Sequence, residues 1–385
     1  MKRLPIRATS QVVLFSSILL GTAGVHSTLA QGCVAVRGGG MCTMNHALSG
    51  DGVGLQEKGW LASVGYRFFK SDRHFIGDSE SRNAAGMNRF EQGTEVINYS
   101  SFIDASLTYQ FSARYSATMT LPYVYHVRSA PYEHSGVRRD TTSSGLGDIR
   151  ATVGAWIWDP KENPKGNLQV SIGVKAPTGD YGADDTFYQD QDPTAGVNIQ
   201  PVRRNVDQSI QPGDGGWGMS VEFNGYRELA PRWIAYLQGF YLFNPQNVNS
   251  SKNPTARRDA GPRVGGVDID NGMSITDQYM ARGGFTYVIS RKHAVAFSLG
   301  GRIEGVPVED LNGNAGDQEG FRRPGFAVAL EPGISWMPGK WNVALNSPLR
   351  VYANRERSYW DQQKGRHGDA AFADYLLTFS VSRIF

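Results

Sequence analysis

A two-residue alternation of apolar and polar side chains runs along most of this chain and constrains its fold more than any other feature. Within residues 114–128, Tyr115, Met119 and Tyr123 fall on one face, and polar side chains such as Thr118 fall on the other. Successive side chains of a β-strand point to opposite faces, so the pattern predicts strands with one apolar and one polar face. Such strands suit a wall that separates hydrocarbon from water.

The alternation divides the chain into twelve candidate strands. They lie near residues 59–69, 96–111, 114–128, 145–158, 167–177, 216–229, 232–243, 275–289, 293–305, 324–337, 341–354 and 372–385. Each covers about ten residues or more, the length that a tilted strand needs to cross the hydrocarbon core of a bilayer. After residue 30, no apolar run is long enough to span a membrane as a helix, and the mean hydropathy of the chain is −0.38.

The connections between these segments alternate between short and long. The short links are 112–113, 159–166, 230–231, 290–292 and 338–340, and the long links are 70–95, 129–144, 178–215, 244–274, 306–323 and 355–371. Outer-membrane barrels have short periplasmic turns and long outer loops, so this order predicts an all-β, up-and-down antiparallel transmembrane β-barrel of about twelve strands, with both chain ends in the periplasm. A soluble β-sandwich or propeller is the competing fold, but neither requires this regular exchange of link lengths.

The last segment carries the pattern that outer-membrane barrels present to their insertion machinery. Tyr375, Leu377 and Phe379 alternate toward a terminal Phe385, and Arg383 interrupts the apolar face near its end. We therefore expect outer-membrane lipid and the barrel insertion machinery as partners, and the outer membrane as the location of the protein.

The first thirty residues have the features of a secretory signal peptide. Three basic residues precede an apolar core, and Thr28-Leu29-Ala30 supplies small residues at the cleavage site. This segment contains no acid, so 36 of the 39 Lys and Arg residues remain in the mature chain, against 36 Asp and Glu. A chain without net charge gives no reason to expect a nucleic-acid partner. Three parts are predicted: signal peptide 1–30, a periplasmic N-terminal segment 31–58, and the barrel 59–385.

Cys33 and Cys42 are the only cysteines of the chain, and they flank a glycine-rich stretch. In an oxidising periplasm this spacing favours one local disulfide, and the closed loop would be able to plug the barrel from below. Two alternatives stay open. One is a lipoprotein, although Leu29 lies one position too far from Cys33, and the other is a pair of free thiols in a tail.

Three short motifs accompany the fourth, fifth and sixth segments: SGLGD at 144–148, KAPTGD at 175–180 and QPGDG at 211–215. The G-L-G-D strand start and the K-x-P-T-G-D strand end resemble a large family of outer-membrane barrels that is named after a meta-pathway phenol-degradation gene product and described as transporters. The resemblance covers the chain from the fourth segment to the C-terminus and implies uptake of small, often hydrophobic or aromatic, compounds. The N-terminal cysteine segment is not part of the family pattern. On a plainer interpretation, Gly147, Gly179 and the aspartates beside them only shape turns.

The polar faces of the segments would line a lumen. Its outer half is predicted to carry mostly basic side chains with a few acids, namely Arg67, His126, Arg128, Asp148, Arg150, Lys175, Arg302, Glu304 and Arg350. A mouth with an excess of positive charge favours anionic solutes. In the plainer alternative, these charges pair with one another and with acids such as Asp104 and Glu222, and they do not select solutes.

These features favour an outer-membrane channel or facilitator for small solutes, either hydrophobic and aromatic or anionic, without a cofactor. One alternative is a non-catalytic barrel that docks a periplasmic or electron-transfer partner through the disulfide loop. A second is a barrel-embedded hydrolase, which needs a nucleophile within reach of a base. The histidines are dispersed, and His74, His134 and His367 are expected in exposed outer loops, so no catalytic residue is predicted. The sequence also lacks metal-ligand spacing, a phosphate-binding loop and a haem attachment motif.

Overall fold

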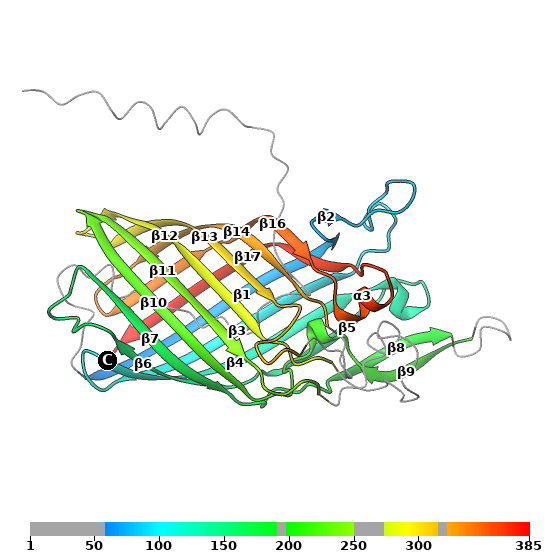
Figure 1. The fold of residues 1–385 in the computed structure, drawn as a ribbon, viewed down its shortest axis with the longest axis horizontal. Coiled ribbons are helices and arrows are strands. Elements are labelled where there is room, and N and C mark those ends of the chain that lie inside the picture. The colour runs from blue at the N-terminus through cyan, green and yellow to red at the C-terminus, as the bar shows by residue number, and fades with distance from the viewer. Residues whose placement is uncertain (1–57, 191–197, 250–272, 315–321) are drawn as a thin grey trace, which may run out of the picture.

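The fold is an antiparallel sheet that closes on itself as a barrel (Figure 1). The computed structural model describes residues 58–190, 198–249, 273–314 and 322–385. Within these residues, each barrel strand pairs with its neighbours along the chain, and the last strand pairs with the first. The predicted all-β, up-and-down barrel is confirmed. The predicted signal peptide and the Cys33–Cys42 segment lie outside the described residues.

Twelve strands form the wall in the described part of the chain, and two of them are interrupted and carry two labels. They are β1 (Gly59–Ile76), β3 (Ile97–Gln110), β4 (Tyr115–Ser129), β5 (Asp140–Leu146) with β6 (Arg150–Trp156), β7 (Gly166–Lys175), β10 (Gly218–Ala230), β11 (Trp233–Phe243), β12 (Gln278–Ser290), β13 (Val295–Val306), β14 (Gly325–Trp336), β15 (Trp341–Asn346) with β16 (Leu349–Arg355), and β17 (Ala370–Ile384). The loops carry β2 (Ser79–Glu80), β8 (Asp184–Asp190), β9 (Ile199–Asn205), the 3-10 turns η1 (Pro131–His134) and η2 (Gln208–Ile210), and helix α3 (Tyr359–Gln363). Among the described residues, no helix is long and apolar enough to cross a membrane.

Side-chain exposure along the strands follows the predicted two-residue period. On β4, Tyr123 and Tyr125 point outward and are 45% and 51% exposed, whereas His126 and Arg128 point inward and are 2% and 1% exposed. The outer surface of the wall is therefore a belt of apolar and aromatic side chains. Closure of the sheet removes the free strand edges that hydrocarbon does not tolerate.

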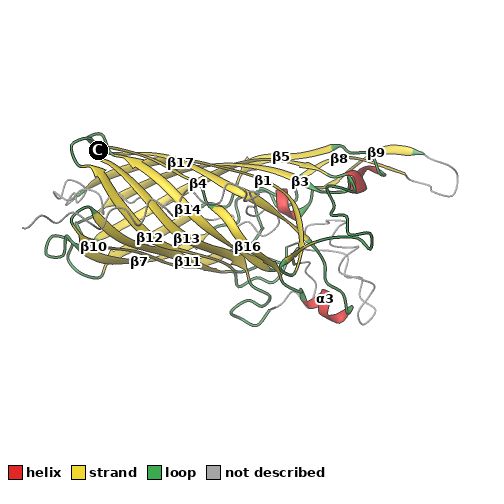
Figure 2. Ribbon diagram, turned by 90° about the horizontal axis from the view of Figure 1, so that it is seen from above, coloured by secondary structure: helices red, strands yellow, loops and turns green. Residues whose placement is uncertain are grey.

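The two ends of the barrel differ as the link lengths predict. The tight turns, the start of β1 and the C-terminus lie at one end, and the long loops lie at the other (Figure 1). At the loop end, β5 and the β8–β9 hairpin extend past the barrel (Figure 2). Because short turns face the periplasm in outer-membrane barrels, the loop end is the outer end.

The fourth strand departs from the predicted segment 145–158. It begins earlier, at β5, and a β-bulge interrupts it before β6, where three of its residues face two of β4. Pro122 of β4 stands opposite the bulge and has no N–H group to donate, and its carbonyl accepts a hydrogen bond of 2.8 Å from Gly147 N. The eleventh strand is also divided, at Ser347-Pro348 between β15 and β16.

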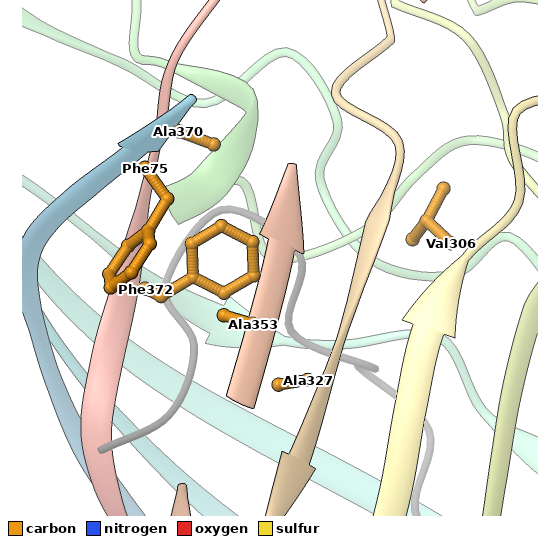
Figure 3. Close-up of a cluster of buried hydrophobic side chains, with 6 residues drawn as sticks. All are labelled: Phe75, Val306, Ala327, Ala353, Ala370 and Phe372. Atoms are coloured by element: carbon orange, nitrogen blue, oxygen red, sulfur yellow. The ribbon is translucent and has the colours of Figure 1, made fainter. Parts of the chain in front are cut away.

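An apolar cluster lies inside the outer end of the barrel, where β1, β13, β14, β16 and β17 meet (Figure 3). Its members are Phe75, Val306, Ala327, Ala353, Ala370 and Phe372. The rings of Phe75 and Phe372 meet edge to face, with their centroids 5.6 Å apart. The two-residue period fails at this point, because residues 370–373 of β17 are all buried. This part of the wall is covered on both faces.

Candidate functional site

The barrel encloses a lumen lined by β1, β3, β4, β6, β7, β10, β11, β12 and the end of β17. Its empty space is about 2040 Å³ when the part open to solvent is included. The lumen begins beside Gly59 and Ile384 at the turn end and reaches Pro212 and Asp214 of an outer loop. It therefore runs through the barrel from the turns to the underside of the outer loops.

The half of the lumen next to the turns is lined mainly by small hydroxyl side chains. Ser106 and Thr120 share a hydrogen bond of 2.9 Å between β3 and β4. One step closer to the turns, Thr108 and Thr118 share a second bond of 2.8 Å. A hydroxyl group both donates and accepts hydrogen bonds, so this wall presents neutral polar groups to the lumen.

The inner side of the wall near the outer loops carries ion pairs, and four residues of the predicted set, His126, Asp148, Arg150 and Lys175, line the lumen itself. Every cation of the predicted set lies beside a carboxylate, and the pairs, with their nitrogen–oxygen distances, are Arg67–Asp104 (2.9 Å), Arg128–Glu133 (3.0 Å), Arg150–Glu222 (3.7 Å), Lys175–Asp214, Arg302–Glu304 (2.5 Å) and Arg350–Asp374 (3.5 Å). The predicted residues do lie on the inner side of the wall, but their charges are balanced by these acids. An anion preference of the lumen therefore stays a prediction.

Three of these arginines also lie over phenylalanine rings. The distances from the guanidinium carbon to the ring centroid are 4.5 Å for Arg67 over Phe102, 5.3 Å for Arg150 over Phe240, and 4.4 Å for Arg350 over Phe75. Stacking on a ring and pairing with a carboxylate together fix the plane of a guanidinium group. Phe102 and Phe240 line the lumen together with Leu242 and Met280. We call these four apolar side chains the collar.

The three motifs that carry the family resemblance meet at the outer end of the lumen. Asp148 of the first motif accepts hydrogen bonds from the amides of Gly179 and Asp214, over 3.0 and 3.1 Å. A Cβ atom on Gly179 would meet Gly213 Cα at 2.7 Å, so these two backbones touch only because both residues are glycine. Lys175 pairs with Asp214 and ties the second motif to the third. These contacts hold the three motifs together, and Asp148, Lys175 and Asp214 also line the lumen, so the plainer interpretation of the motifs stays a prediction.

Two loop segments fold into the outer end of the lumen. The first is residues 206–216, which we call the plug segment, and the second is residues 273–277. Ile210 of the plug segment and Ile275 of the second segment are completely buried. The carbonyl of Ile210 accepts a hydrogen bond from the side chain of Ser143 in β5. Both segments also line a small cavity together with side chains of β1, β3 and β13, so they lie inside the mouth of the lumen.

Asp207 fastens the plug segment to two arginines. Arg323, in the loop before β14, reaches both carboxylate oxygens of Asp207 at 2.9 and 3.0 Å, and Arg128 of β4 lies 3.5 Å from the same carboxylate. Burial alone would raise the pKa of the Asp207 carboxyl, but the two guanidinium groups outweigh burial and hold this pKa below its usual range. The carboxylate is therefore ionised. We call these three side chains the clamp.

A second buried ion pair lies within the loop between β13 and β14, and its arginine also contacts the loop before β12. Arg322 lies 2.5 Å from Asp310, and its Nε donates to Ser274 over 3.1 Å. The clamp and this pair together connect the loops before β10, β12 and β14. The sequence predicts neither Asp207 nor Arg323 as a functional residue, because charged side chains are ordinary in outer loops.

Two histidines that were expected in exposed loops are buried instead. His74 lies on the outer extension of β1 and is 6% exposed, and His134 lies in η1 and is 1% exposed. His74 Nδ1 lies 3.2 Å from Asp369, and its Nε2 accepts a hydrogen bond of 3.0 Å from the amide of Val96. His134 Nδ1 accepts one of 3.1 Å from the amide of Tyr188. The prediction of exposure is wrong for both histidines, because the outer loops pack as a folded layer.

Comparison with known proteins gives likenesses of fold at low identity. No protein-family model matches the sequence, and the search of curated proteins found no match either. The β domain of the Bordetella autotransporter BrkA is 12% identical, with a TM-score of 0.43 over 86% of this chain and 100% of that chain. The P. putida toluene transporter TodX is 10% identical, with a TM-score of 0.42 over 89% of this chain and 94% of that chain. The translocator domain of the autotransporter NalP from Neisseria meningitidis is 13% identical, with a TM-score of 0.44 over 87% of this chain and 91% of that chain.

At these identities and TM-scores, the likenesses assign neither a family nor a substrate to this chain. The resemblance to the meta-pathway family stays a prediction. The location of the protein follows instead from its own architecture. A closed antiparallel wall with an apolar outer face, an even number of strands, and tight turns opposite long loops is the architecture of bacterial outer-membrane proteins. The chain is an outer-membrane β-barrel.

Proposed function

We propose that this barrel is an outer-membrane channel for small solutes, and that the plug segment holds it in a closed conformation. The lumen is the observation that carries the proposal, because it extends from the turn end of the barrel to the plug segment. A purely structural barrel does not require such a space. The closure at the outer mouth consists of loop residues, which are able to move without breaking the sheet.

The lining favours amphipathic solutes. Hydroxyl groups line the half next to the turns, and the collar of Phe102, Phe240, Leu242 and Met280 lies farther out. A small molecule with an aromatic or other apolar part and one polar group would find a partner for each part along this path. Because the cations of the wall are paired with acids, we infer that simple ions are only weakly selected.

Single-channel recording in planar bilayers tests the proposal. The full protein should give discrete conductance steps, and the conductance should fall when a small aromatic alcohol occupies the lumen. A membrane that stays silent with correctly folded wild-type protein and also with correctly folded Asp207→Asn, across voltage and pH, would contradict the channel.

Charge reversal tests the predicted anion preference separately. Replacement of Arg150 and Arg350 by Glu should shift the reversal potential in a salt gradient toward cation preference, because two positive charges on the inner face become negative. An unchanged reversal potential would show that the paired charges do not select solutes.

The two alternative functions receive less support. The disulfide loop that motivates a docking role lies outside the described residues. For a hydrolase, the closest match to a catalytic dyad among the described residues is the buried His74–Asp369 pair. The Nε2 atom that would have to contact a serine nucleophile already accepts a hydrogen bond from the amide of Val96.

A further inference from the structure

A second cavity lies at the outer mouth, and most of the charged groups on its wall are basic. Its empty space is about 1160 Å³ when the part open to solvent is included. The charged and titratable members of its wall are Arg82, Arg89, Arg128, Arg323, His74, Tyr132 and Asp369. We call this cavity the vestibule. It adjoins the clamp, because Arg128 and Arg323 belong to both.

The clamp has the geometry of a carboxylate-binding site that is filled by a side chain of the same protein. Arg323 presents two parallel nitrogen–oxygen contacts of 2.9 and 3.0 Å to Asp207, the fork arrangement that suits a planar carboxylate. Arg128 approaches the same carboxylate, and its Nη2 also donates to Tyr132 over 2.8 Å. Asp207 thus acts as an internal ligand, and it belongs to the segment that closes the lumen.

The vestibule gives a dissolved anion a route to these arginines. Arg82 and Arg89 line the approach and add positive potential, although each also contacts acids. Arg82 lies 3.6 Å from Glu91, and Arg89 lies 2.5 Å from Asp369. A carboxylate that entered would meet Arg128 and Arg323 from the vestibule, while Asp207 meets them from the plug segment.

We propose that the vestibule binds small carboxylates, and that a bound carboxylate replaces Asp207 on Arg128 and Arg323 and so releases the plug segment. The exchange leaves the charge of the clamp unchanged, because one carboxylate takes the place of another. The Asp207 carboxylate leaves the two arginines and also gives up the hydrogen bonds that it accepts from the amide and hydroxyl of Ser209, over 2.9 and 2.8 Å, and it then enters water. This inference rests on the proposed channel and adds a ligand class and a trigger to it.

The main test is single-channel recording of the full protein in a bilayer of zwitterionic lipid. Benzoate added on the outer side should raise the open probability several-fold and with saturation, whereas the neutral isostere benzamide should not. The Asp207→Asn variant should be open without benzoate and insensitive to it. The matched control is Asp184→Asn, which removes an exposed partner of Arg203 on the β8–β9 hairpin and should behave as the wild type.

Binding is measured independently by calorimetry in detergent, with heat-dependent gel mobility as the check of folding. Arg323→Lys keeps the positive charge but loses the fork, and it should weaken benzoate binding about tenfold or more. Equal binding of benzoate and benzamide, or unchanged binding by Arg323→Lys, would overturn the proposal.

The same recordings separate failure of this inference from failure of the channel. If no variant conducts under any condition, the channel itself is wrong. If the wild type conducts but benzoate has no effect and Asp207→Asn stays closed, the channel stands and the carboxylate trigger is wrong. Opening by anionic lipid in the absence of benzoate, without any response to benzoate, would place the ligand in the membrane and also overturn the proposal.

Discussion

Near the turns, the lumen wall is joined by hydroxyl pairs between adjacent strands, whereas at the outer mouth the clamp joins charges from distant parts of the chain. Thr108 and Thr118 are only 10 residues apart, but Asp207 and Arg323 are 116 residues apart. The first kind of contact follows directly from the pairing of β3 and β4. The second depends on how three long loops fold together.

The contrast indicates which part of the lumen is able to change. A hydroxyl pair between two bonded strands keeps its place as long as the sheet exists. A clamp between loops opens when one carboxylate leaves, and the sheet stays intact. We therefore expect the turn half to be a fixed passage and the outer half to be the gate.

The largest effect is expected from Asp207→Ala. This substitution removes the carboxylate that Arg323 contacts with two nitrogens, while Arg128 keeps its pair with Glu133, and breaking a buried ion pair in this way costs about 3–5 kcal/mol. Hydrogen exchange of the plug segment should accelerate roughly a hundredfold or more, while exchange in the barrel strands stays unchanged. Equal protection of residues 206–216 in variant and wild type would contradict the role of the clamp.

A smaller effect is expected from Gly213→Ala. An added Cβ atom would meet the Gly179 carbonyl oxygen at 2.5 Å, so the joint between the second and third motifs would have to open. Overpacking of this kind costs about 1–3 kcal/mol. The control is Gly301→Ala, where a Cβ atom would meet nothing within 4 Å. The difference between the two variants in the hydrogen-exchange rate of the plug segment measures how much the contact between Gly179 and Gly213 stabilises that segment. Equal exchange rates would show that the close contact is not needed.

Thr118→Val tests the turn half and should have a modest effect. Valine keeps the shape of threonine but loses the hydrogen bond to Thr108, which is worth about 1 kcal/mol. Urea unfolding in detergent should show this small loss, and hydrogen exchange of the plug segment should not change. If Thr118→Val accelerated hydrogen exchange of the plug segment as much as Asp207→Ala does, the distinction between a fixed turn half and a movable outer half would be wrong.

The smallest effect is expected from mild acid, through His134. Burial lowers the pKa of this imidazole below its ordinary value of 6.5, while Glu133 and Asp185 act in the opposite direction and Arg139 and Arg204 reinforce the lowering. The unfolded chain therefore binds the proton more readily than the folded one. The stabilisation is complete well above pH 6.5 and declines as the pH falls through 6.5 toward the lowered value.

Hydrogen exchange near His134 tests this sign. Protonation of Nδ1 removes the acceptor of the Tyr188 amide, so exchange in β8 should accelerate as the pH falls, after correction for the intrinsic rate. His134→Gln should abolish this pH dependence. A pH dependence that survives the substitution would assign the effect to another group.

The wall could be predicted from the sequence because its determinants are local. Each β-strand is recognised by the alternation of apolar and polar side chains in its own sequence, and each turn by its short length. The twelve predicted strands and their order therefore agree with the structure. The prediction of strand pattern failed where contacts with a neighbouring part of the chain override the local sequence. Pro122 imposes a bulge on the strand beside it, and residues 370–373 are covered on both faces, so their burial does not alternate.

The site was predicted only in part. The inward position of Arg128, Arg150 and Lys175 follows from strand periodicity, but the acids that face them cannot be assigned without the register of the whole barrel. Asp207 and Arg323 lie in polar loops and share no pattern. Their pairing depends on tertiary folding, which brings together residues that the sequence keeps far apart.

The central claim is that a lumen passes through the barrel and that the clamp closes its outer mouth. Single-channel recordings of Asp207→Asn and Asp184→Asn under identical conditions test this claim most directly. We predict that the first variant is open for most of the recording and that the second gates as the wild type does. Two variants with the same open probability would contradict the account.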